Sequence, residues 1–190
     1  MLQDDIFSGY ITEHQNLFME LDNIKSAIFE AGQIICDALQ KSNKILVCGN
    51  GGSAGDAQHL AAELVGRFEM ERRALPGIAL TTDTSILTAL GNDYGYDTVF
   101  ARQIEGLGDK GDVFIGISTS GSSKNILIAN ETAKKKGLKT VGLLGRDGGS
   151  LASLADLSIV IPHNNTARIQ EVHIFIIHFW ASLVEKTLFS

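Results

Sequence analysis

The sequence predicts a doubly wound, flavodoxin-like α/β domain built around a five-stranded parallel sheet. Five short apolar runs are continuous rather than alternating, which is typical of strands buried on both faces. Longer stretches with helical spacing of apolar residues separate these runs. The length of 190 residues, with 44% hydrophobic and 20% charged residues, fits one soluble globular domain. We therefore expect a single domain, with N-terminal helices over residues 1–42 and an α/β core over residues 43–190.

The elements follow one another in a regular order. Apolar residues at helical spacing from Ile24 to Leu39, and the segment Ile6–Leu21 before them, indicate one long or two consecutive amphipathic helices. The five apolar runs predict strands at residues 44–49, 77–81, 112–118, 139–145 and 157–162. The segments between them predict helices at about 53–68, 85–90, 98–107 and 123–136, and a last helix covers about 166–188.

Charge, cysteine content and hydropathy limit the partners and the compartment. A net charge of −6 argues against nucleic acid, because phosphate backbones are held by clustered Lys and Arg. Cys36 and Cys48 lack metal-like spacing, so we expect reduced, buried thiols. The N-terminus lacks the features of a signal peptide, and the longest apolar run, His173–Val184, is too short to span a bilayer. We expect a cytoplasmic protein that contacts no membrane and acts on a small molecule.

The turn after the first strand, "GNGGSAGD", raises three alternatives: a nucleotide-binding loop, a phosphate cradle for a sugar, or a tight strand-to-helix turn. A P-loop requires a Lys after its last glycine, where this chain has Asp56. The dinucleotide fingerprint fails because its third glycine comes one residue late, at Gly55, and no acidic residue closes the second strand. We therefore expect no nucleotide cofactor. Ser53 and Asp56 also match a helix capping box, which is the purely structural reading.

The turn after the third strand, "ISTSGSSKN", places four serines and one threonine between a buried strand and a helix. Hydroxyl groups beside the free N–H groups of a helix N-terminus favour an anion. This pattern favours a phosphate site over a simple N-capped turn.

Histidines and a carboxylate stand on two of the predicted helices. His59 and Glu63 are one turn apart on the same side of the helix after the first loop. They fit two metal ligands, a base with its neighbour, or a solvated pair, and spacing alone favours the solvated pair. The last helix is apolar almost all round and must be buried in the core or against another subunit. Its histidines, His173 and His178, fit satisfied core residues.

Four segments together resemble the sugar isomerase (SIS) family and, within it, the phosphoheptose isomerases. They are "CGNGGSAGDAQHLAAELVGR", "GNDYGYDTVFARQ", "GDVFIGISTSGSSKNI" and "ARIQEVHIFIIHF". The resemblance extends from about Lys44 to the end of the chain and implies one SIS domain over residues 1–190. The S-T-S-G-x-S loop is typical of the wider family. The His59/Glu63 pair together with Gln170 and His178 marks the phosphoheptose isomerase branch.

The resemblance also implies which residues form the site. Glu63 is the implied base and His178 the implied acid, with a zinc ion held by His59, Glu63, Gln170 and His178. The implied substrate-binding set is Asn50, Gly51, Gly52, Ser53, Glu63, Asn92, Asp93, Ser118, Thr119, Ser120, Ser123 and Gln170. Gln170 and His178 are eight residues apart, about 12 Å along a straight helix, so one ion can scarcely collect both from one unbroken helix. Either the helix is distorted or one ligand comes from a neighbouring chain. The apolar surface of the helix favours the second option.

The implied reaction is aldose–ketose isomerisation of sedoheptulose 7-phosphate to glycero-manno-heptose 7-phosphate, for the heptose of surface lipopolysaccharide. Glu63 and His178 could act as a base and an acid pair, or the zinc ion could instead polarise the carbonyl group and also set the orientation of the side chains. The implied assembly is a homotetramer with active sites at subunit interfaces. An alternative is a non-catalytic SIS-fold protein that associates with the bacterial replication initiator, although the intact set of four polar residues favours the enzyme. A sugar-phosphate-sensing regulator would need a DNA-binding domain, for which the sequence has no room.

Overall fold

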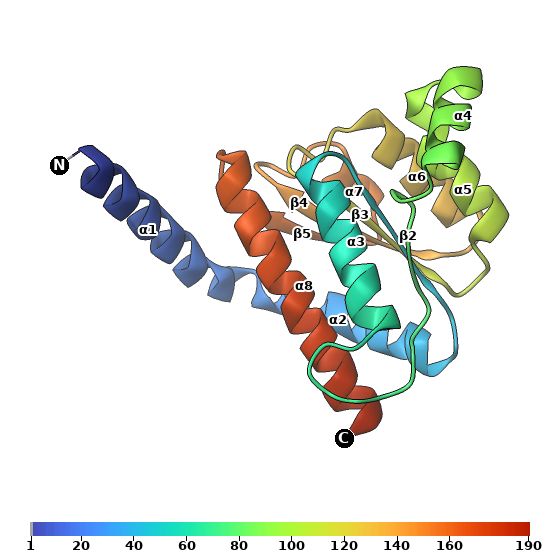
Figure 1. The fold of residues 1–190 in the computed structure, drawn as a ribbon, viewed down its shortest axis with the longest axis horizontal. Helices are drawn as coiled ribbons and strands as arrows, with labels where there is room; N and C mark the ends of the chain where they lie inside the picture. The colour runs from blue at the N-terminus through green and yellow to red at the C-terminus, as the bar shows by residue number, and fades with distance from the viewer. Residues whose placement is uncertain (1) are drawn as a thin grey trace.

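The five apolar runs form one sheet whose strands are all parallel, in the order β2-β1-β3-β4-β5 (Figure 1). The computed structural model describes residues 2–190. The strands are β1 (Ile45–Gly49), β2 (Gly77–Ala79), β3 (Val113–Ser118), β4 (Lys139–Gly145) and β5 (Leu157–Ile161). Both the predicted fold class and the five strands are confirmed, with ends that differ by at most two residues.

The helices enclose the sheet in two layers. They are α1 (Leu2–Glu20), α2 (Lys25–Gln40), α3 (Gly52–Val65), α4 (Thr84–Tyr94), α5 (Val99–Leu107), α6 (Lys124–Lys135), α7 (Leu151–Leu154) and α8 (Thr166–Phe189). Two short 3₁₀ turns, η1 (Leu21–Asn23) and η2 (Tyr96–Thr98), separate α1 from α2 and α4 from α5. The N-terminal region therefore consists of two consecutive helices. The helix predicted to reach Phe68 ends instead at Val65, and α7 was not predicted.

Each face of the sheet has its own core, because successive side chains of a strand point to opposite faces. Helices α2, α3 and α8 pack on the face that carries Ile45 and Val47. Helices α5, α6 and α7 pack on the face that carries Leu46 and Cys48. Both cysteines are free and buried, as predicted.

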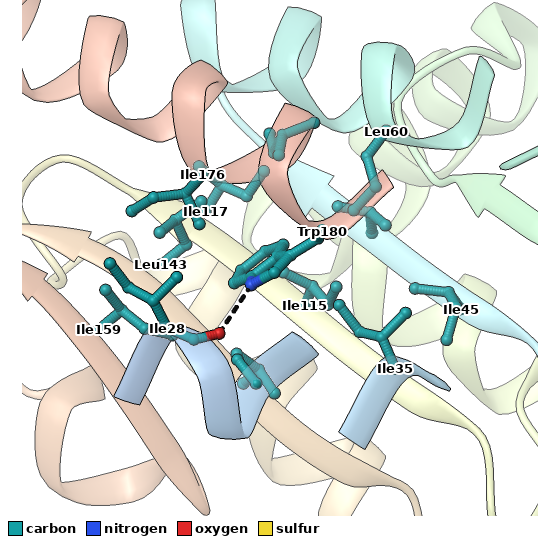
Figure 2. Packing of buried hydrophobic residues seen from close by; sticks show 14 of the residues in the cluster. Ile28, Ile35, Ile45, Leu60, Ile115, Ile117, Leu143, Ile159, Ile176 and Trp180 are labelled. Atoms are coloured by element: carbon teal, nitrogen blue, oxygen red, sulfur yellow. Dashed lines mark hydrogen bonds between the residues drawn. The ribbon is translucent and has the colours of Figure 1, made fainter. Parts of the chain in front are cut away.

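Trp180 anchors α8 to the first of these cores. Its indole ring is fully buried among isoleucines of the sheet and of α2, and Nε1–H donates to the carbonyl of Ile28 at 3.0 Å (Figure 2). Truncation of such a side chain typically costs about 3–5 kcal/mol. Helix α8 has the length and hydropathy of a membrane-spanning helix, yet ten of its residues are buried in this fold. Helix α8 is therefore a core helix of this domain.

Helix α1 projects away from the rest of the chain (Figure 1). Among its described residues only Leu17 is buried, whereas Leu2, Ile6 and Phe7 are exposed by 50% or more. Polar and cation–π contacts tie its middle to α8. The His14 ring nitrogen Nδ1 lies 2.9 Å from the Glu171 carboxylate, and the Arg168 guanidinium stacks over Tyr10. The apolar end of α1 thus lacks a partner within the described chain.

The strand order fixes where a ligand can enter. The connections that leave β1 and β3 run to opposite sides of the sheet, so the loops at their carboxyl ends separate and leave a crevice between them. Open parallel sheets bind their ligands at this position. Both glycine- and serine-rich turns lie at this edge, because one follows β1 and the other follows β3.

Candidate functional site

A cavity of about 320 Å³ opens between the two loops at the carboxyl ends of β1 and β3. Its walls come from the β1–α3 turn, the β3–α6 turn and the start of α8. The lining residues are Asn50, Gly51, Gly52, Ser53, Ile117, Ser118, Thr119, Ser123, Thr166 and Gln170. Eight of these ten residues belong to the predicted substrate-binding set. Ile117 and Thr166 are additions.

The β3–α6 loop presents hydroxyl groups to this cavity. Ser118 Oγ lies 3.2 Å from Ser123 Oγ and accepts a hydrogen bond from the N–H of Gly121 at 3.0 Å. Ser123 is the N-cap residue of α6, but its side chain makes no capping hydrogen bond. The Ser123 hydroxyl is therefore available to a ligand beside a helix N-terminus, as an anion site requires. Ser120 lies outside the cavity lining, and its hydroxyl accepts from the N–H of Ser122 at 3.3 Å.

The loop between β4 and α7 packs against the β3–α6 loop at Gly121. Gly121 has φ of +62°, and a Cβ atom there would lie 1.8 Å from the carbonyl oxygen of Gly148. The N–H of Leu151, at the start of α7, donates to the carbonyl of Gly121 at 2.9 Å. The loop between β4 and α7 thus fixes the serine-rich loop through backbone contacts, which the sequence analysis did not anticipate.

The β1–α3 turn is held by a pair of amides. Asn50 and Asn125 exchange two hydrogen bonds, of 3.0 and 2.9 Å, and Tyr96 Oη donates to Asn50 Oδ1 at 3.3 Å. Asn125 is only 4% exposed, so this pairing fixes the rotamer of Asn50 at the cavity wall. Asn125 and Tyr96 stand within motifs that the sequence analysis quoted, but their role depends on distances that a sequence does not give.

Two expectations about the first loop and α4 differ from the structure. The capping box of Ser53 and Asp56 is not formed, because α3 begins at Gly52 and its N-cap residue is Gly51, with φ of +56°. Asn92 and Asp93 lie exposed on α4, where the Asn92 amide donates to the Asp93 carboxylate at 2.8 Å, and neither lines the cavity.

His59, Glu63 and His178 form a second group farther down α3 and α8, and one ligand atom of each lies within 4.8 Å of the others. His59 Nε2 lies 2.9 Å from His178 Nε2 and 3.0 Å from Glu63 Oε1. The single hydrogen that His59 Nε2 can carry cannot satisfy both neighbours in full, whereas a cation between the three atoms would. Two imidazole nitrogens and a carboxylate oxygen are ligands that zinc prefers, and three protein ligands leave a fourth position open. These three residues, hereafter the His–Glu–His cluster, therefore form a possible metal site compatible with zinc. The sequence alone favours a solvated His59/Glu63 pair, which is incomplete because His178 is a third partner.

Gln170 does not join this cluster. Helix α8 is unbroken from Thr166 to Phe189, and the Gln170 amide packs over Gly52, where an added Cβ would lie 2.4 Å from Gln170 Nε2. The distorted-helix option is therefore wrong. Within residues 2–190 the structure assembles three of the four expected metal ligands, all from one chain, and places Gln170 at the cavity about 12 Å away along the helix axis.

Two further titratable groups lie nearby. Asp56, one turn before His59, has a buried oxygen, Oδ2, without a hydrogen-bond partner among the described residues. Burial raises the pKa of Asp56 to about 6, although the nearby His59 acts in the opposite direction. His173 is fully buried and its Nε2 lies 3.1 Å from the carbonyl of Leu144. Burial lowers the pKa of His173 to about 4 against the effect of this hydrogen bond. The prediction of a core histidine is confirmed by its burial, but the ring is only half satisfied, because Nδ1 has no hydrogen-bond partner among the described residues.

Comparisons with known proteins identify the family of this fold. The SIS domain family model matches residues 9–145. A phosphoheptose isomerase from Nitratiruptor is 57% identical over 178 residues, which are 93% of this chain and 95% of the relative. The solved phosphoheptose isomerases of Neisseria gonorrhoeae and Francisella tularensis superpose with TM-scores of 0.91 and 0.94, at 42% and 38% identity. Each superposition covers 98% of this chain and 100% of the solved chain.

Proposed function

Because the chain belongs to the SIS domain family and, within it, to the phosphoheptose isomerases, we propose that it interconverts D-sedoheptulose 7-phosphate and D-glycero-D-manno-heptose 7-phosphate. It is an aldose–ketose isomerase. The observation that favours an enzyme over a binding protein is the His–Glu–His cluster, since a binding protein of the same fold has no need of a base and an acid beside each other. The substrate is inferred from the phosphoheptose isomerases that the chain resembles. The product would supply heptose for surface lipopolysaccharide, and the whole chain would act as one SIS domain in the cytoplasm.

The serine-rich loop would bind the phosphate group. Ser118, Thr119 and Ser123 line the cavity beside the N-terminus of α6, where hydroxyl groups and the helix macrodipole both favour an anion. This end of the substrate does not react, so its contacts contribute binding that is equal in the ground state and the transition state. Asn50, fixed by Asn125, would bind a sugar hydroxyl group next to it.

Glu63 and His178 would move the protons. In the ketose-to-aldose direction, Glu63 takes a proton from C1, and the electron pair of the broken C–H bond forms the C1=C2 double bond of the enediol. Glu63 then delivers the proton to C2. His178 transfers a proton between O1 and O2, so that the negative charge on either oxygen is neutralised as it develops. In the alternative with a zinc ion held by His59, Glu63 and His178, the metal would supply Lewis-acid polarisation of the carbonyl oxygen in place of proton transfer by His178, because a nitrogen bound to the metal cannot also carry the proton.

We further propose that a complete site combines two chains of a homotetramer. The cavity wall consists of residues other than His59, Glu63 and His178, and Gln170 closes it against Gly52. A neighbouring chain that covers the apolar end of α1 could bring its own cavity, with Gln170, to the His–Glu–His cluster of the first chain. The exposed apolar residues of α1 support this arrangement.

Turnover of a panel of five- to seven-carbon ketose phosphates, measured in a coupled assay, tests the proposed reaction. Sedoheptulose 7-phosphate should give the highest kcat/KM, and absence of turnover with every member would favour the binding-protein alternative.

Subunit mixing tests the assembly. At substrate concentrations far below the KM of a Ser118→Ala/Ser123→Ala variant, mixed tetramers of Glu63→Gln with this variant should be more active than either variant alone, because some sites would then be intact. Mixed tetramers of Glu63→Gln with His178→Ala should regain none, because both residues come from one chain. Recovery in neither mixture, despite verified mixed tetramers, would place cavity and cluster in the same chain.

A further inference from the structure

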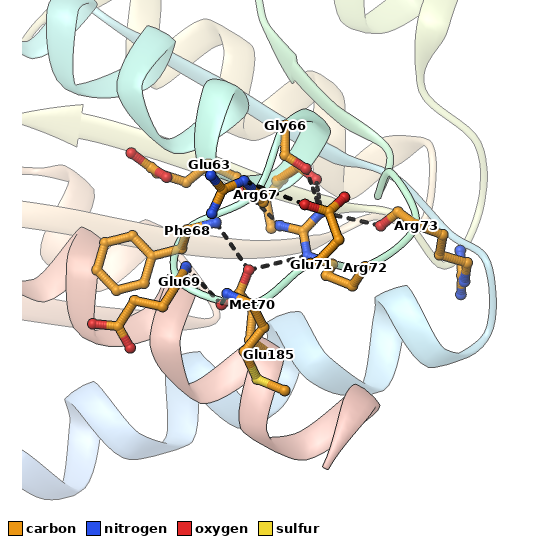
Figure 3. Close-up of polar contacts among 11 residues, drawn as sticks. Glu63, Gly66, Arg67, Phe68, Glu69, Met70, Glu71, Arg72, Arg73 and Glu185 are labelled. Atoms are coloured by element: carbon orange, nitrogen blue, oxygen red, sulfur yellow. Dashed lines mark hydrogen bonds and ion pairs between the residues drawn. The ribbon is translucent and has the colours of Figure 1, made fainter.

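The segment that follows α3, residues 66–76, has no regular secondary structure but is fixed by a buried ion pair (Figure 3). Arg72 Nε lies 3.2 Å from Glu185 Oε1, and the two side chains are 2% and 1% exposed. Burial of two charges is costly unless every polar atom is satisfied. The partners of this pair therefore show what it holds in place.

Glu185, near the end of α8, binds three consecutive backbone N–H groups. Those of Phe68, Glu69 and Met70 donate to its carboxylate at 2.9, 2.9 and 2.8 Å. Burial alone would raise the pKa of Glu185, but these three hydrogen bonds and the positive charge of Arg72 outweigh it and hold the pKa below its usual value. The carboxylate is thus charged and ties the segment to α8.

Arg72 caps the end of α3. Its guanidinium group donates to the carbonyls of Leu64 at 2.8 Å and Gly66 at 2.9 Å, and also to the carbonyl of Glu63. The last carbonyls of a helix lack intrahelical partners, and a cation there also interacts favourably with the helix dipole. Arg72 therefore fixes the turn of α3 that carries Glu63.

Both contacts lead to the His–Glu–His cluster. The ring of Phe68, whose N–H is held by Glu185, stacks on the imidazole of His178 with centroids 5.5 Å apart and planes 26° from parallel. His178 and Glu185 are seven residues apart on α8 and so lie on the same face. Arg72 thus contacts the backbone of Glu63, and Glu185 holds the backbone of Phe68, whose ring contacts His178.

We propose that Arg72 and Glu185 are positioning residues for the His–Glu–His cluster, and that Phe68 is the contact through which they set the plane of the His178 ring. The expected effects on zinc affinity and on kcat rest on the proposed function. The expected effect on the His178 ring does not. A pair that served stability alone would leave the cluster unchanged when it is weakened.

The test compares Glu185→Gln with Glu71→Gln in the full-length protein. Glu71 makes a matched control because it lies in the same segment but is 89% exposed, in an ion pair with Arg67. Three quantities are measured below the melting temperature: the ¹H–¹³C signals of the His178 ring in metal-free protein, the zinc dissociation constant by chelator competition, and kcat and KM. For Glu185→Gln we expect a shifted His178 signal, a zinc dissociation constant about 10- to 100-fold higher and a comparable fall in kcat, as for outer-shell partners of metal ligands. KM should stay close to that of the wild type, because the phosphate cavity is built from other residues. Glu71→Gln should match the wild type in all three.

A folded Glu185→Gln variant that loses thermal stability but keeps the wild-type ring signal, zinc affinity and kcat would overturn the inference. If Glu185→Gln does not fold, Phe68→Leu decides. The loss of its ring should shift the His178 signal and weaken zinc binding, and Phe68→Tyr should restore both, whereas an unchanged Phe68→Leu protein would refute the proposal. If the wild type binds no zinc, the zinc site proposed above fails, and the ring signal alone tests the positioning role.

Discussion

Replacement of Gly121 by alanine tests how the serine-rich loop is held. Gly121 has φ of +62°, and the added Cβ would lie 1.8 Å from the oxygen and 2.3 Å from the carbon of the Gly148 carbonyl. No side-chain rotation relieves this overlap, because both contacts are to backbone atoms. The serine-rich loop must therefore move away from the loop between β4 and α7.

The cost has three parts. The left-handed conformation costs a non-glycine residue about 1–2 kcal/mol. The hydrogen bond from Leu151 N–H to the Gly121 carbonyl contributes about 0.5–1.5 kcal/mol, and the overpacking about 1–3 kcal/mol. We expect a loss of about 3 kcal/mol or more in the free energy of unfolding. For a chain of this length that lowers Tm by about 6–12 °C.

Calorimetry and steady-state kinetics measure the two consequences. The control for stability is Gly51→Ala, since Gly51 has φ of +56° but nothing within 4 Å of the added Cβ. It should lose only the conformational part, about 1–3 kcal/mol for its sparsely populated backbone conformation with ψ of −122°. Gly121→Ala should also raise KM for the sugar phosphate about tenfold or more, because hydrogen bonds to a charged phosphate are displaced. Equal losses of Tm in the two variants, or an unchanged KM in Gly121→Ala, would refute the reasoning.

Three other changes address the site and the core. Ser123→Ala should raise KM about tenfold or more and leave kcat nearly unchanged, as loss of uniform binding requires, and an unaltered KM would mean that the phosphate lies elsewhere. Glu63→Gln should lower kcat roughly 10²–10⁴-fold with an unchanged circular dichroism spectrum, and substantial residual activity would remove Glu63 from the mechanism. His173 has its pKa lowered from 6.5 to about 4, so the unfolded state binds more protons between these values and stability should fall by about 3 kcal/mol as the pH falls through this window. Urea unfolding at pH 7 and pH 5 should show a smaller difference for His173→Gln than for the wild type, while an identical difference would assign the acid sensitivity to other groups.

Most of the fold could be predicted from the sequence, because strands buried on both faces leave continuous apolar runs and their connecting helices leave a clear 3.6-residue period. The exceptions have local causes. Helix α3 ends before Phe68 for two reasons. Gly66 follows its last residue, and Arg72, which lies outside the helical pattern of apolar residues, caps its carbonyls. Helix α7 has only four residues, too few to show a period.

The site could be predicted in chemical type but not in arrangement. Ser118 and Ser123 stand beside a helix start in the sequence, so their role is local and visible there. The meeting of His59 with His178 joins residues 119 positions apart, and only the packing of α3 on α8 brings them together. Asn125 and Glu185 could not have been selected from the sequence, since a single Asn or Glu in a helix gives no signal until its partner is known.

Helix α1 has a consequence for the order in which the chain acquires its structure. Most of the stability of a helix in a protein comes from tertiary packing, and this 19-residue helix buries only one side chain against its own chain. The sheet and its two cores can close through contacts within the chain. If the proposed homotetramer covers the apolar end of α1, folding of the core is a first-order event and ordering of α1 a second-order one. The backbone amides of α1 should exchange with solvent faster as the protein is diluted, while those of β1 and β3 exchange at a rate that dilution does not change.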